Sequence, residues 1–292
     1  MKQRHWFCLL LLTPCSLLFS QDLSVYKKAF YIQGNDTLPY RILYPEPYDS
    51  SKTYPFVLFL HGAGDRGKDN EKPLTKGGKL FANANIRATY PAFVVFPQCS
   101  FFSFWSNVRF GFDTAKKRPL FLFQEGGPPS KSMQMLVDMT HDLLQKLPVN
   151  KEQVYVGGLS MGGMGSYEIV NRMPGVFAAA FPICGAANQA IAPALSKTSW
   201  WIFHGKKDPV VPFHFSEDMV AALKEQNARV KFTAYPDAYH NCWDNAFAEP
   251  QLLPWLFSQK LPIDLLLNEA NLKTTIKVSV PDRGVIYLPH KN

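Results

Sequence analysis

Short apolar runs alternate along this chain with longer segments in which apolar residues recur at helical spacing. Continuous apolar runs predict buried strands over residues 55–60, 93–96, 154–156, 178–183, 200–203 and 230–235. Amphipathic spacing predicts helices over residues 131–146, 163–172, 216–225 and 251–259. Because strands and helices alternate throughout, the sequence predicts an α/β fold with one mostly parallel central sheet and helices on both faces.

The segments at the two ends of this pattern set the limits of the predicted domain. Residues 26–33 and 37–44 predict a hairpin that leads into the first buried strand. We expect one folded domain over residues 21–260 and a tail over residues 261–292. The tail contains a strand-like stretch at 274–280, which either adds an edge strand or packs loosely.

The first twenty residues have the pattern of a secretory signal peptide. Lys2 and Arg4 supply a positive start, residues 6–19 are mostly apolar, and Ser20 is small enough for cleavage after it. The apolar run is too short for a comfortable membrane span, and Pro14 interrupts it. We therefore expect export to the periplasm or the medium after cleavage near Ser20, without stable membrane insertion.

Composition supports a folded domain and argues against a nucleic-acid partner. The 292 residues are 47% hydrophobic and 18% charged, which is enough apolar material for a large core. The net charge of +8 falls to +6 when Lys2 and Arg4 leave with the signal peptide. The sequence has no stripe of Lys and Arg interleaved with stacking aromatic residues, so no nucleic-acid binding is expected.

Residues 158–162 read Gly-Leu-Ser-Met-Gly, which is a G-x-S-x-G pattern. The pattern follows the apolar strand 154–156 and precedes the predicted helix 163–172, the strand–turn–helix context of a nucleophilic serine. A chance match in a glycine-rich turn is the alternative, but this context favours Ser160 as a nucleophile. Because a free serine hydroxyl is a weak nucleophile, a base and an orienting acid are expected elsewhere in the chain.

The acid and the base are expected downstream of the serine, in that order. Asp208 lies in a loop rich in Gly and Pro that follows the strand 200–203, and we assign it the role of the acid. His240 lies in a loop beyond the strand 230–235, and its ring can reach between Ser160 and Asp208. The sequence therefore predicts a Ser-His-Asp triad.

Other histidines and aspartates compete for these roles. We interpret His204 as a structural residue that hydrogen-bonds the acid loop, and His214 as a surface or capping residue. Asp237 and Asp244 are alternative acids, but both are too close to His240 in sequence to reach the far nitrogen of its ring easily.

Residues 61–67 form a glycine-rich loop after the first buried strand. Such a loop can aim a backbone N–H at a developing oxyanion, and the N–H of Met161 next to the nucleophile is the expected second donor. Phosphate binding is the alternative, but the loop lacks the G-K-[S/T] ending of a phosphate-binding loop. We expect Asp65 and Arg66 to form an ion pair that holds the loop.

Five motifs in a fixed order resemble a known family. They are His61-Gly62-Ala63-Gly64-Asp65-Arg66-Gly67, Phe96-Pro97-Gln98-Cys99, Gly158-Leu159-Ser160-Met161-Gly162-Gly163, the stretch from His204 to Pro212, and His240-Asn241-Cys242-Trp243. They look like α/β-hydrolase carboxylesterases of the polyhydroxybutyrate-depolymerase and feruloyl-esterase type. That family includes carbohydrate esterases that remove acyl groups from plant polysaccharides.

The resemblance covers roughly residues 39–259 and implies an α/β-hydrolase catalytic domain. It implies that Ser160, Asp208 and His240 form the triad. It also implies an oxyanion donor just after the His-Gly pair, at Ala63. Cys242 stands where this family would have a small polar residue, and the tail after residue 261 has no counterpart.

Residues 97–130 interrupt a strand-to-helix connection at the end of the sheet where ligands bind. They carry eight large aromatic residues: Phe101, Phe102, Phe104, Trp105, Phe110, Phe112, Phe121 and Phe123. These residues either form an aromatic wall for a ring-bearing acyl group or pack the loop onto the body. We expect Trp105 and Trp243, which follows the triad histidine, to contact substrate.

Three cysteines remain after removal of the signal peptide, namely Cys99, Cys184 and Cys242. A Cys184–Cys242 disulfide and three buried thiols are both open interpretations for an exported protein. No pair has C-x-x-C spacing, so no metal site is expected. A lipid anchor at Cys15 is the alternative to cleavage, but Pro14 before it suits lipoprotein processing poorly.

The sequence therefore predicts a secreted serine esterase that needs no metal or organic cofactor. Its substrates would be small-molecule or polysaccharide-linked esters, with acetyl and feruloyl groups among the candidates. One alternative is a serine peptidase of the prolyl-oligopeptidase kind, which usually needs an extra propeller domain. Another is a non-catalytic glycan-binding member of the fold, whose signature would be a lost triad residue.

Overall fold

The computed structural model describes residues 22–114, 118–124, 126–262 and 285–286, and its centre is a nine-stranded sheet. The strand order is β10-β9-β8-β7-β3-β4-β2-β1-β11. The strands are β1 (Lys27–Gln33), β2 (Asp36–Leu43), β3 (Tyr54–Leu60), β4 (Phe93–Pro97), β7 (Val149–Leu159), β8 (Ala179–Ile183), β9 (Ser199–Gly205), β10 (Val230–Tyr235) and β11 (Val285–Ile286). The six strands from β10 to β4 are parallel, which confirms the mostly parallel sheet.

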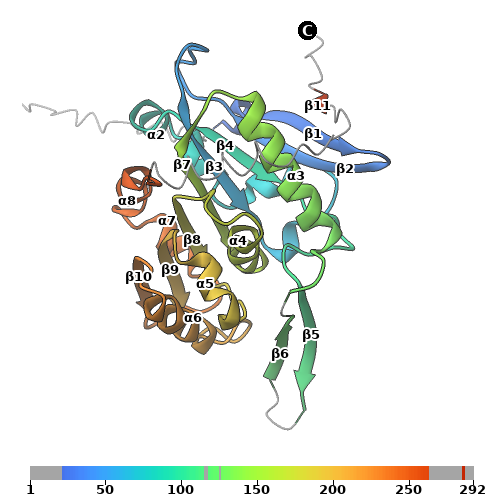
Figure 1. The fold of residues 1–292 in the computed structure, drawn as a ribbon, viewed down its shortest axis with the longest axis vertical. Helices are drawn as coiled ribbons and strands as arrows, with labels where there is room; N and C mark the ends of the chain where they lie inside the picture. Colours follow the sequence, from blue (N-terminus) through green and yellow to red (C-terminus); the bar gives the residue numbers. More distant parts are fainter. Residues whose placement is uncertain (1–21, 115–117, 125, 263–284, 287–292) are drawn as a thin grey trace, which may run out of the picture.

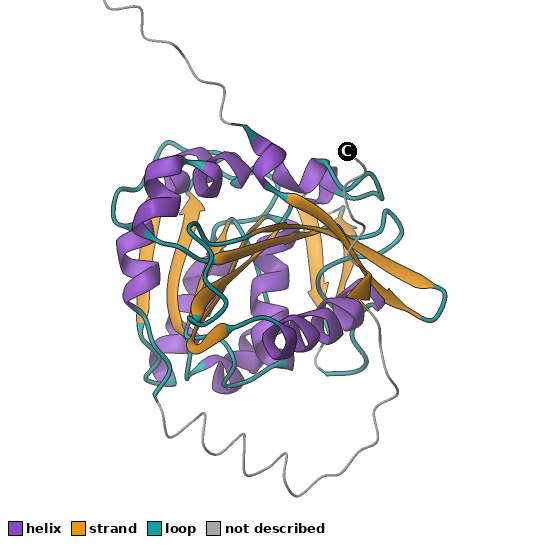
Figure 2. Cartoon of the chain, turned by 90° about the horizontal axis from the view of Figure 1, so that it is seen from above, coloured by secondary structure: helices purple, strands orange, loops and turns teal. Residues whose placement is uncertain are grey.

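Helices cover both faces of this sheet, as the view from above in Figure 2 shows. They are α1 (Gly78–Ala82), α2 (Ala84–Thr89), α3 (Lys131–Lys146), α4 (Met161–Arg172), α5 (Ala192–Leu195), α6 (His214–Glu225), α7 (Trp243–Phe247) and α8 (Leu252–Ser258). The sequence pattern located α3, α4, α6 and α8 to within two residues at each end. The four short helices lie in connections where the pattern predicted none.

The alternation of side chains along β3 shows how one strand supplies two cores. Phe56, Leu58 and Leu60 face the core that also holds the apolar sides of α3, α4, α5 and α6. Val57 and Phe59, one residue out of phase, face the core that holds α1, α7 and α8. Because both faces of the strand are buried, its sequence is a continuous apolar run rather than an alternating one.

A separate two-stranded hairpin projects from the body at the lower edge of Figure 1, in the insertion 97–130. Its strands are β5 (Val108–Asp113) and β6 (Arg118–Phe123), paired antiparallel with Phe110 opposite Phe121. Phe121 and Phe123 pack against Phe215 of α6. The hairpin root is thus attached to the body, while Phe110 and Phe112 stay more than half exposed.

The predicted terminal segments are described only in part. The signal-peptide segment and the strand-like stretch 274–280 lie outside the described residues. A different piece of the tail, β11, pairs antiparallel with β1 at Tyr31 and Phe30 and forms the edge of the sheet. In the described part of the chain, no helix combines the length and hydropathy that crossing a membrane requires.

Candidate active site

Ser160 lies between the end of β7 and the start of α4 in a strained backbone conformation. Its φ is 53° and its ψ is −117°, a region that residues with a side chain rarely adopt. Its N–H donates to the carbonyl of Ile183 on the neighbouring strand β8, at 2.9 Å. A Cβ atom at Gly162 would lie 1.9 Å from the carbonyl oxygen of Leu60, so only glycine allows α4 to start so close to β3.

The side chains of Ser160, His240 and Asp208 form a hydrogen-bonded row. His240 Nε2 lies 2.9 Å from Ser160 Oγ, and His240 Nδ1 lies 2.7 Å from Asp208 Oδ2. Asp208 follows β9 and His240 follows β10, and the carboxyl ends of parallel strands meet at one edge of the sheet. The three residues that the sequence selected are therefore brought together, although 80 residues separate the serine from the histidine.

Both carboxylate oxygens of Asp208 are engaged. Oδ1 accepts hydrogen bonds from the backbone N–H groups of Val210 and Val211, at 2.8 and 3.0 Å. Oδ2 faces His240 and also His204, whose Nε2 lies 3.3 Å away. Burial alone raises the pKa of the Asp208 carboxyl, but the hydrogen bonds from His204 and His240, the electrostatic attraction of His240 and the backbone N–H of Val211 together outweigh burial and hold the pKa well below its usual range. Asp208 is therefore a fixed negative charge at neutral pH.

His204 behaves as the sequence predicted, as a structural residue of the acid loop. Its side chain is fully buried, with Nδ1 at 2.7 Å from Ser216 Oγ and Nε2 at 3.0 Å from the carbonyl oxygen of Val211. The alternative acid Asp237 is exposed and forms an ion pair with Lys207 at 2.7 Å.

The two predicted oxyanion donors, Met161 and Ala63, lie in segments beside Ser160. Met161 is the first residue of α4, so its N–H has no partner within the helix. Ala63 begins a short 3₁₀ turn that follows Gly62, and a Cβ at Gly62 would lie 2.9 Å from Leu159 Cδ1. This contact places the Ala63 turn against the residue that precedes Ser160. Both predicted oxyanion donors therefore belong to segments next to the nucleophile.

The turn that carries Ala63 is fixed by partners that sequence reasoning did not identify. His61 is buried, accepts the N–H of Cys99 at Nε2, and donates from Nδ1 to the carbonyl oxygen of Gly62. These partners assign the neutral tautomer with hydrogen on Nδ1. Burial lowers the pKa of His61 to about 4, so the ring is neutral at pH 7.

Arg66 and Asp65 hold the same turn in a different way from the one predicted. Arg66 Nε donates to the carbonyl oxygen of Ala63 at 3.0 Å, and Nη1 donates to the carbonyl oxygens of Phe101 and Ser103. Asp65 accepts from the hydroxyl of Thr75 at 3.1 Å. The expected Asp65–Arg66 ion pair is wrong, because each side chain instead ties the turn to another loop.

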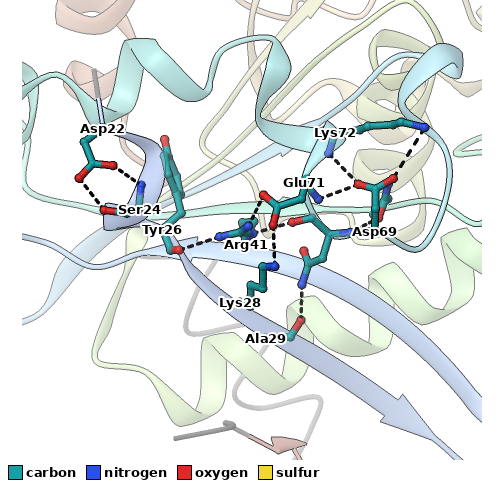
Figure 3. A network of polar contacts seen from close by, with 11 residues as sticks. Asp22, Ser24, Tyr26, Lys28, Ala29, Arg41, Asp69, Glu71 and Lys72 are labelled. Carbon is teal, nitrogen blue, oxygen red and sulfur yellow. Dashed lines mark hydrogen bonds and ion pairs between the residues drawn. The ribbon is translucent and has the colours of Figure 1, made fainter. Parts of the chain in front are cut away.

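A polar network centred on the buried side chain of Arg41 supports the loop after this turn (Figure 3). Arg41 of β2 donates to the backbone carbonyls of Asn70 and Tyr26 and pairs with Glu71. The N–H of Asn70 donates to Gln98, whose side-chain amide donates back to the carbonyl oxygen of Asp65. The side chain of Gln98 therefore explains why the Pro-Gln-Cys motif accompanies the glycine-rich loop.

The two predicted substrate contacts have different surroundings. Trp105 is 0% exposed, packs edge-on against His61, and lies against Gly165 of α4. The prediction that Trp105 contacts substrate is therefore wrong, and the packing alternative holds for this residue. Trp243 is partly exposed and its ring lies edge-on to His240 at 5.7 Å, so substrate contact by Trp243 stays a prediction.

The three described cysteines are buried free thiols, so the structure has no Cys184–Cys242 disulfide. The Cys184 thiol donates to the backbone carbonyl of His240 at 3.5 Å, and burial raises its pKa well above the ordinary value. Among the described residues, Cys184, Asp208 and His240 place potential metal-ligand atoms within 4.8 Å of one another. The protonated thiol and the hydrogen on His240 Nδ1 make this trio a poor fit to a metal, because metal ligands must be deprotonated.

Comparison with known proteins identifies the family of this chain. Residues 48–251 match the family described as Phospholipase/Carboxylesterase. Carboxylesterase SOBER1 of Arabidopsis thaliana is 28% identical over 202 residues, which cover 64% of this chain and 83% of the plant protein. The matched range contains all three members of the hydrogen-bonded row.

Solved structures agree with this assignment. A thermostable esterase matches with a TM-score of 0.72 and 28% identity, covering 82% of this chain; the chain spans 64% of that protein. A CE1 ferulic acid esterase from Anaeromyces mucronatus, solved with ferulic acid, matches with a TM-score of 0.57 over 80% of this chain and 90% of its own. Because the ferulic acid esterase is only 15% identical to this chain, the match shows that the two proteins share a fold.

Proposed function

We propose an exported serine esterase that uses Ser160, His240 and Asp208, because the chain belongs to the phospholipase/carboxylesterase family and carries this hydrogen-bonded row. The chain is a carboxylic ester hydrolase with an α/β-hydrolase fold. The proposal adds the residues that carry the reaction, the export of the protein, and its acyl substrates.

The observation that carries the mechanism is the pair of contacts at the two nitrogens of His240, 2.9 Å to Ser160 Oγ and 2.7 Å to Asp208 Oδ2. Ser160 Oγ attacks the ester carbonyl while His240 Nε2 takes its proton. Asp208 holds the ring in position and stabilises the imidazolium. His240 then gives the proton to the leaving alcohol, and water releases the acid from the acyl-enzyme by the same route.

The tetrahedral intermediate needs donors for its oxyanion. The N–H groups of Met161 and Ala63 take this role in the proposal, since both belong to segments next to Ser160. Arg66 fixes the carbonyl of Ala63 and His61 fixes that of Gly62. The donor turn is thus set before the substrate arrives, which is the condition for effective oxyanion stabilisation.

Acetyl or feruloyl esters on plant polysaccharides are the proposed substrates. The shared fold of the ferulic acid esterase supports this choice, as do the exposed aromatic rings of the insertion 97–130. Export is supported by the signal-peptide pattern of the first twenty residues. Mass spectrometry of protein secreted by an expressing bacterium tests export, and a mature form that still contains Lys2 and Arg4 would contradict it.

The mechanism is tested by Ser160→Ala with Ser196→Ala as the matched control. Ser160→Ala should lower kcat on 4-nitrophenyl acetate by about 10⁴-fold or more, since the covalent route passes through this hydroxyl. Ser196→Ala, whose hydroxyl bonds only locally to Pro193 in the structure, should keep wild-type activity. A fluorophosphonate should add its mass to the wild type and the control but not to Ser160→Ala. Retention of a tenth of the activity by Ser160→Ala would reject the nucleophile.

A panel of acetylated and feruloylated oligosaccharides, aryl esters and aryl amides tests the substrate class. The proposal is supported if the wild-type protein hydrolyses the oligosaccharide esters with a higher kcat/KM than the aryl esters. Faster cleavage of amides than of esters would support a peptidase instead. Binding of glycans without turnover of any ester would support a non-catalytic protein.

A further inference from the structure

A cavity of about 770 Å³ lies beside the oxyanion turn, between the start of β2, the root of the β5–β6 hairpin and the start of α3. Aromatic rings and hydroxyl groups together form its wall, which includes Arg66, Phe101, Phe102, Phe104, Ser106 and Asn107. Its volume is in the range of small-molecule sites. Neither Ser160 nor His240 lines it, so it is additional to the proposed reaction centre.

The charged side chains that line the cavity already have partners. Lys131 Nζ lies 2.5 Å from Asp36 Oδ1, and Arg66 donates to three backbone carbonyls. A charged ligand would have to compete with these contacts. The cavity therefore suits a neutral group that offers hydroxyls and an apolar face.

The hydroxyl of Ser106 lacks a hydrogen-bond partner within the described residues, which indicates that a ligand supplies one. Ser106 is 5% exposed, lines the cavity, and its buried Oγ has no hydrogen-bond partner in the structure. Buried polar atoms without a partner are rare in folded proteins because they lose their hydration without compensation. A hydroxyl of a bound ligand would satisfy this atom once the Ser106 side chain turns towards the cavity.

Two phenylalanines supply flat apolar surface at the same cavity. Phe102 is 95% exposed and Phe101 is 62% exposed, and the two rings meet edge to face at 5.5 Å. Arg66 lies over the ring of Phe101 and fixes one side of this platform. Large rings left this exposed on adjacent residues indicate a binding surface rather than core packing.

The cavity is joined to the proposed reaction centre through two side chains. Arg66 contacts the carbonyls of Ala63 at the oxyanion turn and of Phe101 at the cavity wall. Phe104, which lines the cavity, packs onto the cluster that contains Met164 of α4 and Val211 of the acid loop. The cavity wall is therefore in contact with the turn that carries Ala63 and with Met164, whose N–H donates to the backbone carbonyl of Ser160.

From these observations we propose that the cavity is a subsite for a neutral pyranose ring in the alcohol part of the substrate. The C–H face of the sugar stacks on Phe102 while Phe101 meets its edge, and its hydroxyls bond to Ser106 Oγ and to the side-chain oxygen of Asn107, whose Nδ2 already donates to the backbone. The inference rests on the proposed esterase function, since it assigns the polysaccharide side of the cleaved ester to this cavity.

The test compares two substrates with the same acyl group, an acetylated xylopyranose tetrasaccharide and 4-nitrophenyl acetate. Phe102→Ala should lower kcat/KM on the tetrasaccharide ester by about 2- to 13-fold through KM and leave 4-nitrophenyl acetate unchanged. Phe112→Ala is the matched control, because Phe112 is 60% exposed on the hairpin but does not line the cavity. Equal effects of Phe102→Ala on both substrates, no effect on either, or the same loss in Phe112→Ala would overturn the subsite.

Ser106→Ala separates binding from folding. Removal of a buried hydroxyl that has no partner should not lower the melting temperature, whereas loss of its bond to the sugar should raise KM for the tetrasaccharide ester by about 2- to 13-fold. A lower melting temperature with unchanged KM would overturn the ligand role.

Direct binding keeps this inference distinct from the reaction. Calorimetry with the Ser160→Ala protein should show binding of the unesterified tetrasaccharide. A protein that carries Phe102→Ala in addition to Ser160→Ala should bind the tetrasaccharide more weakly. Selective weakening of methyl ferulate turnover by Phe102→Ala, without an effect on the sugar, would mean that the cavity holds the acyl ring and would overturn the proposal. Failure of wild-type protein to cleave any ester would reject the proposed function but not sugar binding.

Discussion

His204 Nε2 lies 3.3 Å from Asp208 Oδ2, and both side chains are fully buried. Because Nε2 faces this carboxylate and also the carbonyl of Val211, it must act as the donor. Asp208 therefore has a neighbour that orients it independently of His240. This second histidine distinguishes Asp208 from Asp237, which lies in solvent beside Lys207.

The first prediction compares these two aspartates. Asp208→Asn should give folded protein with kcat reduced by about 10²–10⁴-fold, because the imidazole loses the charge that orients and stabilises it. Asp237→Asn is the control and should change kcat by less than about 2-fold, since it breaks only an exposed ion pair. Steady-state kinetics on 4-nitrophenyl acetate check both variants. The reverse pattern would assign the acid to Asp237.

The burial of His61 predicts that the free energy of unfolding depends on pH, independently of catalysis. Burial lowers the pKa of His61 to about 4 in the folded protein, whereas the unfolded chain has the ordinary value of 6.5. Between these values the unfolded state binds more protons, so stability is complete above pH 6.5 and is lost as the pH falls towards 4. The loss at pH 4 amounts to about 3 kcal/mol at most.

Urea denaturation between pH 7.5 and 4 measures this effect, and His61→Asn is the control because it cannot titrate. The control should be less stable at pH 7.5 but should show a flatter dependence on pH. Carboxyl groups also begin to titrate at the acidic end of this range, but they affect both proteins alike, so the difference between the two slopes isolates His61. Equal slopes for the two proteins between pH 6.5 and 4 would show that His61 is not the responsible group.

The sequence predicted those features that local pattern determines. The parallel strands are continuous apolar runs, and the triad residues follow strand ends, so β3, β7, β9 and β10 and the row at Ser160 could be located without coordinates. The polar network around Arg41 could not, because its members Tyr26, Arg41, Asn70 and Gln98 lie on four segments that only the folded chain brings together.

The aromatic insertion shows a second limit of the sequence. The strand β5 alternates apolar residues with polar or small ones, a strand signal that the interpretation as a loop overlooked, whereas β6 reads Leu-Phe-Leu-Phe over residues 120–123. Trp105 and Phe102 are three residues apart and both are large aromatic residues, yet one is 0% exposed and the other 95%. Composition indicates that a segment is aromatic, but only packing decides which ring faces solvent.

Because Trp105 is buried, its replacement is expected to change stability rather than substrate preference. Trp105→Phe should lower the free energy of unfolding by about 1–3 kcal/mol, because the smaller ring leaves a void against His61 and Gly165. The ratio of kcat/KM for a feruloyl and an acetyl ester should not change. Trp243→Ala is the contrasting variant and should alter kcat/KM with little effect on melting temperature, since its ring lies beside His240. A changed ester ratio in Trp105→Phe would return Trp105 to the substrate site.

The last prediction uses two glycines beside the proposed reaction centre. At Gly162 a Cβ would lie 1.9 Å from the carbonyl oxygen of Leu60, whereas at Gly64 it would meet no atom within 4 Å. Gly162→Ala must therefore push α4 away from β3 and move Ser160, and we expect insoluble protein or a loss of more than about 4 kcal/mol in unfolding free energy. Gly64→Ala should change that free energy by less than about 1 kcal/mol and keep esterase activity. Expression yield, thermal melting and kcat on 4-nitrophenyl acetate for the pair give the answer. A soluble, active Gly162→Ala protein with wild-type melting temperature would mean that the nucleophile turn tolerates a wider α4–β3 spacing than the structure has.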